Sequence, residues 1–161
     1  MTRSVRLKLV KVAQEQTDLT TRYRQLSRTL KTAEKPVFAY LLGKVADDSQ
    51  ASVKALEKEA PRPDAEGKVK AVLRRLNSII EALETKIERS DNGGAGGGGG
   101  GGASGRTIPL EQLIALRAEQ ADVAERTLEA QENSDSESLK RLAKRQRECR
   151  ELLLQLLRGE Q

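Results

Sequence analysis

Apolar residues recur along most of this 161-residue chain at alternating spacings of three and four positions. A period of about 3.5 residues is typical of α-helices that pack against nearly parallel neighbours. We call each such row of positions a seam. The seams predict an all-α fold, an antiparallel bundle of four or five helices, with helices over residues 4–32, 35–59, 64–90, 108–132 and 135–158.

Three seams lie before residue 91. The first consists of Val5, Leu9, Val12, Gln16, Leu19, Tyr23, Leu26 and Leu30. The second consists of Phe38, Leu42, Val45, Ser49, Ser52 or Val53, and Leu56. The third consists of Val69, Leu73, Leu76, Ile80, Leu83 and Ile87. Pro36 suits the first turn of the second helix, and Pro61-Arg62-Pro63 is expected to end that helix before Asp64 caps the third.

Ten of the thirteen glycines fall between Gly93 and Gly105. A run without side chains cannot bury enough apolar surface to offset the entropy lost on ordering, so residues 92–106 are predicted to form a flexible, disordered linker. The linker separates a three-helix part, residues 1–91, from a helical hairpin, residues 107–161. We expect the two parts to pack as one bundle. The run lacks the Gly-Lys-Ser/Thr ending of a phosphate-binding loop.

The hairpin after the linker carries a seam on each of its helices. The first consists of Leu113, Leu116, Gln120, Val123 and Thr127. The second consists of Leu139, Leu142, Gln146, Cys149, Leu153 and Leu156. Ser134 and Glu137 have the spacing of a capping box, which predicts a short turn between the two helices.

The chain also contains an internal similarity. The stretch from Glu15 to Arg22 matches the stretch from Glu119 to Arg126 at four of eight positions. Each stretch is followed by a short break and a second amphipathic helix. Either the chain contains two related helical hairpins, residues 5–57 and 108–158, or the match is an accident of helix-rich composition.

The amino-acid composition excludes several kinds of functional site. The chain has no histidine and one cysteine, so His-containing zinc sites, Ser-His and Cys-His nucleophile pairs and an internal disulfide are excluded. We therefore predict no catalytic, cofactor-binding or metal-ligating residue. No run of 18 apolar residues occurs, so no segment is predicted to span a membrane, and we expect a cytoplasmic location.

The order of elements resembles the ferritin-like superfamily, including rubrerythrin-type bundles. The stretch from Arg22 through Pro36 and Leu41-Leu42 to Glu57 is similar to a first hairpin of such proteins. The resemblance implies a four-helix bundle whose metal-binding members carry one Glu on each of two helices and a Glu-x-x-His on each of the others. Glu15 and Glu119 match the lone glutamates.

The expected Glu-x-x-His motifs are missing from this sequence. Asp47-Asp48-Ser49-Gln50-Ala51 and Gln146-Arg147-Glu148-Cys149 stand at their places. The resemblance therefore implies a degenerate member that has lost its metal ligands. We interpret Glu15 and Glu119 as solvated carboxylates beside the seams, and Cys149 as a buried, apolar-like residue.

Three glutamines, Gln16, Gln120 and Gln146, interrupt the otherwise apolar seams. A polar seam residue costs stability and is often retained because it fixes helix register or partner choice. Placement at a boundary facing water is the alternative.

The net charge of +5 is unevenly distributed. Residues 1–32 carry eight basic and two acidic side chains, whereas residues 107–131 carry two basic and five acidic ones. Helices of opposite charge can pair within a molecule or between copies. A basic helix also suits nucleic acid, although no aromatic platform or recognised DNA-reading motif accompanies it.

Together these observations predict a non-catalytic helical interaction or assembly protein, which packs through its seams against a protein partner or a second copy. Two alternatives remain open. The first is a degenerate ferritin-like protein with a residual metal- or stress-related role through its carboxylates. The second is a nucleic-acid-binding accessory protein.

Overall fold

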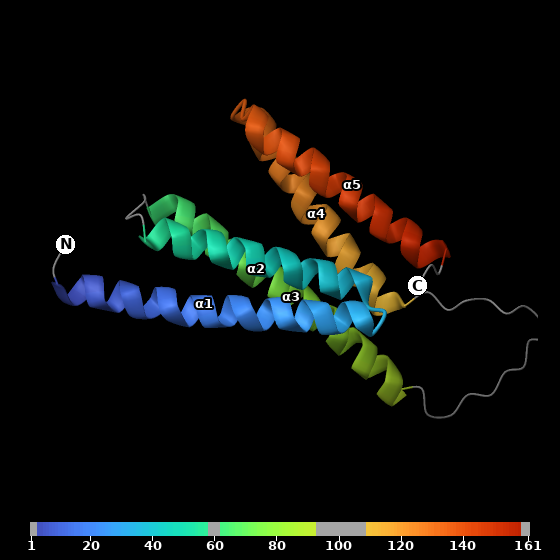
Figure 1. Ribbon diagram of the computed structural model, residues 1–161. Helices are drawn as coiled ribbons and strands as arrows, with labels where there is room; N and C mark the ends of the chain where they lie inside the picture. The colour runs from blue at the N-terminus through green and yellow to red at the C-terminus, as the bar shows by residue number, and fades with distance from the viewer. Residues whose placement is uncertain (1–2, 58–61, 93–108, 159–161) are drawn as a thin grey trace, which may run out of the picture. The chain divides into compact units, whose positions relative to one another are not determined.

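The computed structural model describes residues 3–57, 62–92 and 109–158. Within these ranges it has five helices, which confirms the all-α class (Figure 1). They are α1 (Arg3–Thr32), α2 (Pro36–Glu57), α3 (Arg62–Asn92), α4 (Leu110–Glu132) and α5 (Ser136–Arg158). Residues 93–106 of the predicted linker lie outside the described residues. None of the described helices combines the length and apolar character needed to cross a bilayer.

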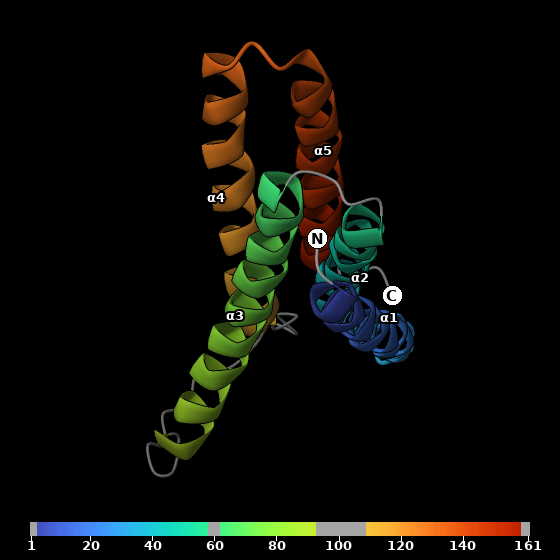
Figure 2. The same ribbon diagram turned by 90° about the vertical axis from the view of Figure 1, so that its left-hand side faces the viewer.

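The chain divides into two compact units, Met1–Ile79 and Ile80–Gln161. In the first unit, α1 and α2 lie side by side as an antiparallel hairpin in both views (Figures 1 and 2). In the second unit, α4 and α5 form another antiparallel hairpin, whose connecting turn is plain in Figure 2. The α3 helix begins at Arg62, and Pro63 is accommodated in its first turn, where a backbone N–H has no intrahelical partner.

The α2 helix provides most of the core of the first unit. Its buried apolar side chains are Val37, Phe38, Ala39, Leu41, Leu42, Val45, Ala46 and Val53. These positions cover a wide arc of the helix, because α2 packs against α1 on one side and contacts α3 through Asp48 on another. Ala71 and Val72 of α3 are also buried.

The face that α1 turns toward α2 coincides only in part with its predicted seam. Small residues point inward at Ala13, Thr20 and Ser27, whereas Val12, Leu19 and Leu26 are exposed at 48%, 39% and 48% of their surface. Ser27 is close enough to α2 to donate a hydrogen bond from its hydroxyl to the Ala39 carbonyl, at 2.6 Å. Small side chains let two helices approach closely, and with these residues facing α2, part of the apolar row of α1 stays uncovered.

The core of the second unit runs between α4 and α5. Val123, Ala130 and Leu142 pack together with the partly buried Leu139. Further buried apolar residues are Ala115, Leu116, Cys149 and Leu156. On α5, Leu142, Cys149 and Leu156 follow one another at seven-residue spacing, as do Leu116, Val123 and Ala130 on α4, which is the heptad repeat of a packed seam.

The two hairpin turns are built identically. In each, one residue has a positive φ, 59° at Glu34 and 52° at Ser134. Lys35 N donates to Leu30 O and Glu34 N donates to Lys31 O in the first turn, and the same bonds recur one hundred residues later. This pair of bonds defines the Schellman ending of a helix, in which the positive-φ residue is usually glycine.

The start of α5 is capped one residue later than the predicted capping box. Ser138 N donates to Asp135 Oδ1 at 3.0 Å, so Asp135 is the capping residue and Ser134 is the positive-φ residue before it. Hydrogen bonds from the Ser138 side chain and backbone lower the pKa of Asp135. In the first hairpin Lys35 occupies the equivalent position, followed by Pro36 as the first residue of α2, where proline was expected.

We expect Ser134→Gly to stabilise the second hairpin. A residue with a Cβ is destabilised by about 1–2 kcal/mol in the left-handed region, because its Cβ lies too close to the backbone. Glycine avoids this strain but loses more conformational entropy on folding, at a cost of about 0.5–1 kcal/mol. The net gain should be about 0.5–1 kcal/mol, measured as a higher urea midpoint by circular dichroism. Ser134→Ala is the matched control; equal stabilisation by both variants would show that relief of the positive φ is not the cause.

Candidate functional site

A polar pair lies inside the first hairpin. Gln16 Nε2 of α1 donates to Ser49 Oγ of α2 at 2.8 Å. Ser49 is fully buried and Gln16 is half-buried. A buried hydroxyl without a hydrogen bond costs free energy, so this bond favours the register that places Gln16 opposite Ser49.

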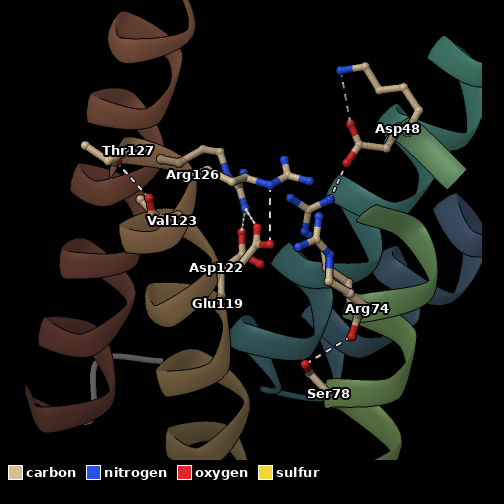
Figure 3. Close-up of polar contacts among 11 residues, drawn as sticks. Asp48, Arg74, Ser78, Glu119, Asp122, Val123, Arg126 and Thr127 are labelled. Carbon is tan, nitrogen blue, oxygen red and sulfur yellow. Dashed lines mark hydrogen bonds and ion pairs between the residues drawn. The ribbon is translucent and has the colours of Figure 1, made fainter. Parts of the chain in front are cut away.

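A partly buried ion pair joins α3 to α2. Arg75 donates from Nη1 to Asp48 Oδ2, and Lys68 Nζ lies 3.9 Å from Asp48 Oδ1 (Figure 3). Arg75 is only 4% exposed. Asp48 therefore has two basic partners on α3, and these contacts favour one position of that helix along α2.

The second hairpin contains a larger charged cluster, drawn around Glu119 and Asp122 in Figure 3. Arg145 of α5 donates from Nη2 to Glu119 Oε1, and also to Asp122 Oδ2 at 3.1 Å. Arg126 Nε lies 3.3 Å from Asp122 Oδ1. The Glu119 side chain is 1% exposed and that of Arg145 is 13% exposed. Burial acts to lower the pKa of Arg145, but the charges and hydrogen bonds of Glu119 and Asp122 together raise it.

The two hairpins place their interhelical polar groups at different distances from the turn, which we call different levels. Because their turns are equivalent at a separation of one hundred residues, Gln16 and Ser49 correspond to Leu116 and Cys149. Leu116 is 2% exposed and Cys149 is fully buried, so the polar pair of one hairpin is replaced by an apolar pair in the other. Conversely, Glu119 and Arg145 correspond to Leu19 and Val45.

The three predicted seam glutamines have different surroundings. Gln16 makes the interhelical bond to Ser49, Gln120 is half-buried, and Gln146 is exposed. The buried charges Glu119 and Arg145 each stand one residue before a glutamine of α4 or α5. That the glutamines set the register stays a prediction for all three.

Arg145, Arg75 and Asp122 are not among the predicted seam residues, because the seams consist of apolar and neutral positions. A signal was nevertheless present. Arg145 lies three residues after Leu142 and four before Cys149, which is the seam spacing itself. Glu119 was expected beside the seam and exposed to solvent, whereas it is buried because Arg145 compensates its charge.

The carboxylates that the ferritin-like resemblance singled out are paired with basic side chains. Glu15 is exposed and lies 3.9 Å from Lys11 Nζ, while Asp48 and Glu119 contact Arg75 and Arg145. Asp47 Oδ1 lies 3.8 Å from Arg24 Nη2. Among the side chains that the structure describes, no group of three or more Cys, Asp or Glu is placed to hold a metal ion.

Several helices present large apolar side chains to solvent. On α1 these include Val12, Leu19 and Leu26, seven residues apart. On α3 they are Val69, Leu73, Ile80 and Leu83, exposed at 42%, 54%, 50% and 42%. These rows are helix surfaces with the spacing of an interface.

No protein-family model matches the chain, and neither a curated protein nor a solved structure matches it.

Proposed function

We propose that this protein is a non-catalytic helical assembly protein, which packs through its seams against a protein partner or a second copy of itself. One observation carries the proposal: the apolar rows predicted to be seams are only partly used inside the hairpins. Val12, Leu19 and Leu26 keep 39–48% of their surface exposed although they recur at heptad spacing. Apolar side chains in such a row stabilise contact with another helix when they leave water.

The internal polar contacts support the same proposal. The Gln16–Ser49 bond and the Glu119–Arg145 pair favour particular alignments within each hairpin. Their role is structural, because each carboxylate in the buried clusters is held by an arginine. We propose that the hairpins serve as rigid scaffolds for exposed helix faces, in a protein of the cytoplasm.

The test replaces the α1 row by the triple substitution Val12→Gln, Leu19→Gln and Leu26→Gln. We expect the wild-type protein to form oligomers, or to co-purify with a helical partner from its native source. The triple variant should weaken that association at least tenfold, as followed by light scattering after size-exclusion chromatography.

The matched control is the double substitution Leu7→Gln and Val10→Gln. These residues are 64% and 61% exposed and lie on the other side of α1 from the row. The control should associate like the wild type. A wild-type protein that stays monomeric and retains no partner would contradict the proposed function.

The metal-linked and nucleic-acid alternatives remain predictions. The described carboxylates bind arginine and lysine side chains, and part of the positive charge of α1 is used within the hairpin, where Arg24 contacts Gln50 and Asp47 of α2. Neither observation favours these alternatives over assembly.

A further inference from the structure

The exposed apolar row of α3 has the pattern of a helix–helix interface. Val69, Leu73, Leu76, Ile80 and Leu83 follow one another at spacings of four, three, four and three residues. Four of the five are exposed and Leu76 is half-buried. In heptad terms they alternate between the d and a positions of a coiled coil, beginning with Val69 at d.

The buried side of α3 is a different face. Ala71, Val72, Arg75, Ile79 and Ala82 are each at most 8% exposed. None of them belongs to the exposed row. The helix thus carries a second apolar face in addition to the one that is already buried.

Charge is separated along the exposed side of α3. The e positions beside the row are Lys70, Asn77 and Glu84, and all three are exposed. A basic residue thus lies seven positions before the asparagine, and an acidic residue lies seven positions after it. In an antiparallel pair of identical helices, e positions face e positions.

We propose that α3 pairs with α3 of a second copy in antiparallel orientation, about a twofold axis beside Asn77. This inference rests on the proposed assembly function and names the partner as the chain itself. Leu73 of one copy then faces Leu83 of the other, and Leu76 faces Ile80. The same alignment sets Lys70 opposite Glu84 of the second copy on both sides of the axis, with Asn77 facing its own copy.

Charge complementarity selects the antiparallel orientation. In a parallel, in-register pair, e positions face g positions, and the g positions here are the buried Val72 and Ile79. No opposite charges meet in that arrangement. The antiparallel arrangement forms two equal ion pairs, as an isologous twofold interface requires.

The test is a charge swap across the proposed interface. Lys70→Glu places an acidic side chain opposite Glu84 of the other copy on both sides of the axis. Glu84→Lys places a basic side chain opposite Lys70 of the other copy in the same way. Exposed ion pairs are weak, so each single variant should weaken the dimer roughly tenfold in sedimentation equilibrium at low salt. The double variant Lys70→Glu/Glu84→Lys restores opposite charges and should recover dimerisation to within about threefold of the wild type.

A control separates this contact from one within the helix. Lys70 Nζ also lies 2.8 Å from Glu66 Oε1 one turn earlier. Glu66→Gln removes that pair but leaves Lys70 in place, so it should not weaken the dimer. Circular dichroism of every variant should show unchanged helix content, because all the exchanged residues are exposed.

The possible outcomes separate the inference from the proposed function. Recovery by the double variant supports antiparallel pairing of α3. If the wild-type protein dimerises and all charge variants dimerise equally, the α3 pairing is wrong while the assembly function stands. A monomer that still binds a different protein likewise overturns the pairing alone. A monomer without any partner contradicts both.

Discussion

Replacing Arg145 by methionine is expected to lower the free energy of unfolding by about 3–5 kcal/mol. Arg145 holds two carboxylates inside the second hairpin, and the Glu119 side chain is 1% exposed. Methionine fills much of the space but leaves the Glu119 charge buried without compensation. Urea unfolding followed by circular dichroism measures the loss.

The double variant Glu119→Met/Arg145→Met separates the cost of an unpaired charge from the loss of packing. Replacing a buried ion pair by apolar residues of similar volume is often neutral or stabilising, so the double variant should recover most of the stability lost in the single one. A double variant as unstable as Arg145→Met would show that the guanidinium acts through Asp122 or through packing instead.

Leu41→Ala is expected to destabilise the first hairpin by about 2–5 kcal/mol. Leu41 is 1% exposed and lies in the middle of the wide buried face of α2. Removing its side chain loses apolar burial and leaves a cavity that the surrounding helices fill only in part. Thermal unfolding followed at the helical circular dichroism band should show a clearly lower Tm.

Leu7→Ala is the matched control for Leu41→Ala. Leu7 is 64% exposed on α1, so the same chemical change should alter stability by no more than about 0.5 kcal/mol. Comparable losses for the two variants would mean that Leu7 is covered in solution, which would itself reveal an interface.

The helices were predictable because their spacing is a local property of the sequence. The seam of α2 agrees with burial at Phe38, Leu42, Val45, Ser49 and Val53. The seam of α1 was only partly right. Its apolar pattern favours Val12, Leu19 and Leu26, but close approach to α2 is decided by the small residues Ala13, Thr20 and Ser27, which apolar periodicity does not distinguish from surface residues.

The polar contacts were less predictable than the helices. Gln16 and Ser49 were each recognised as seam residues, yet their pairing depends on how the turn aligns the two helices. The turn has a positive φ at Glu34 and Ser134, where the sequence lacks the glycine that usually marks such an ending. Arg145 lies at seam spacing from Leu142 and Cys149, but the predicted seam contains the neutral Gln146 in its place.

Because the polar groups of the two hairpins lie at different levels, they disfavour pairing between a helix of one hairpin and a helix of the other. Two hairpins with identical turns offer each helix a wrong partner during synthesis. If α1 paired with α5 in the same geometry, Leu19 would meet the position of Arg145, and Gln16 would meet that of Cys149. Leu19 carries no charge, so Arg145 would lose the contact with Glu119 that it makes in its own hairpin. Exchange of helices between hairpins is therefore penalised by the cluster that stabilises the correct pairing.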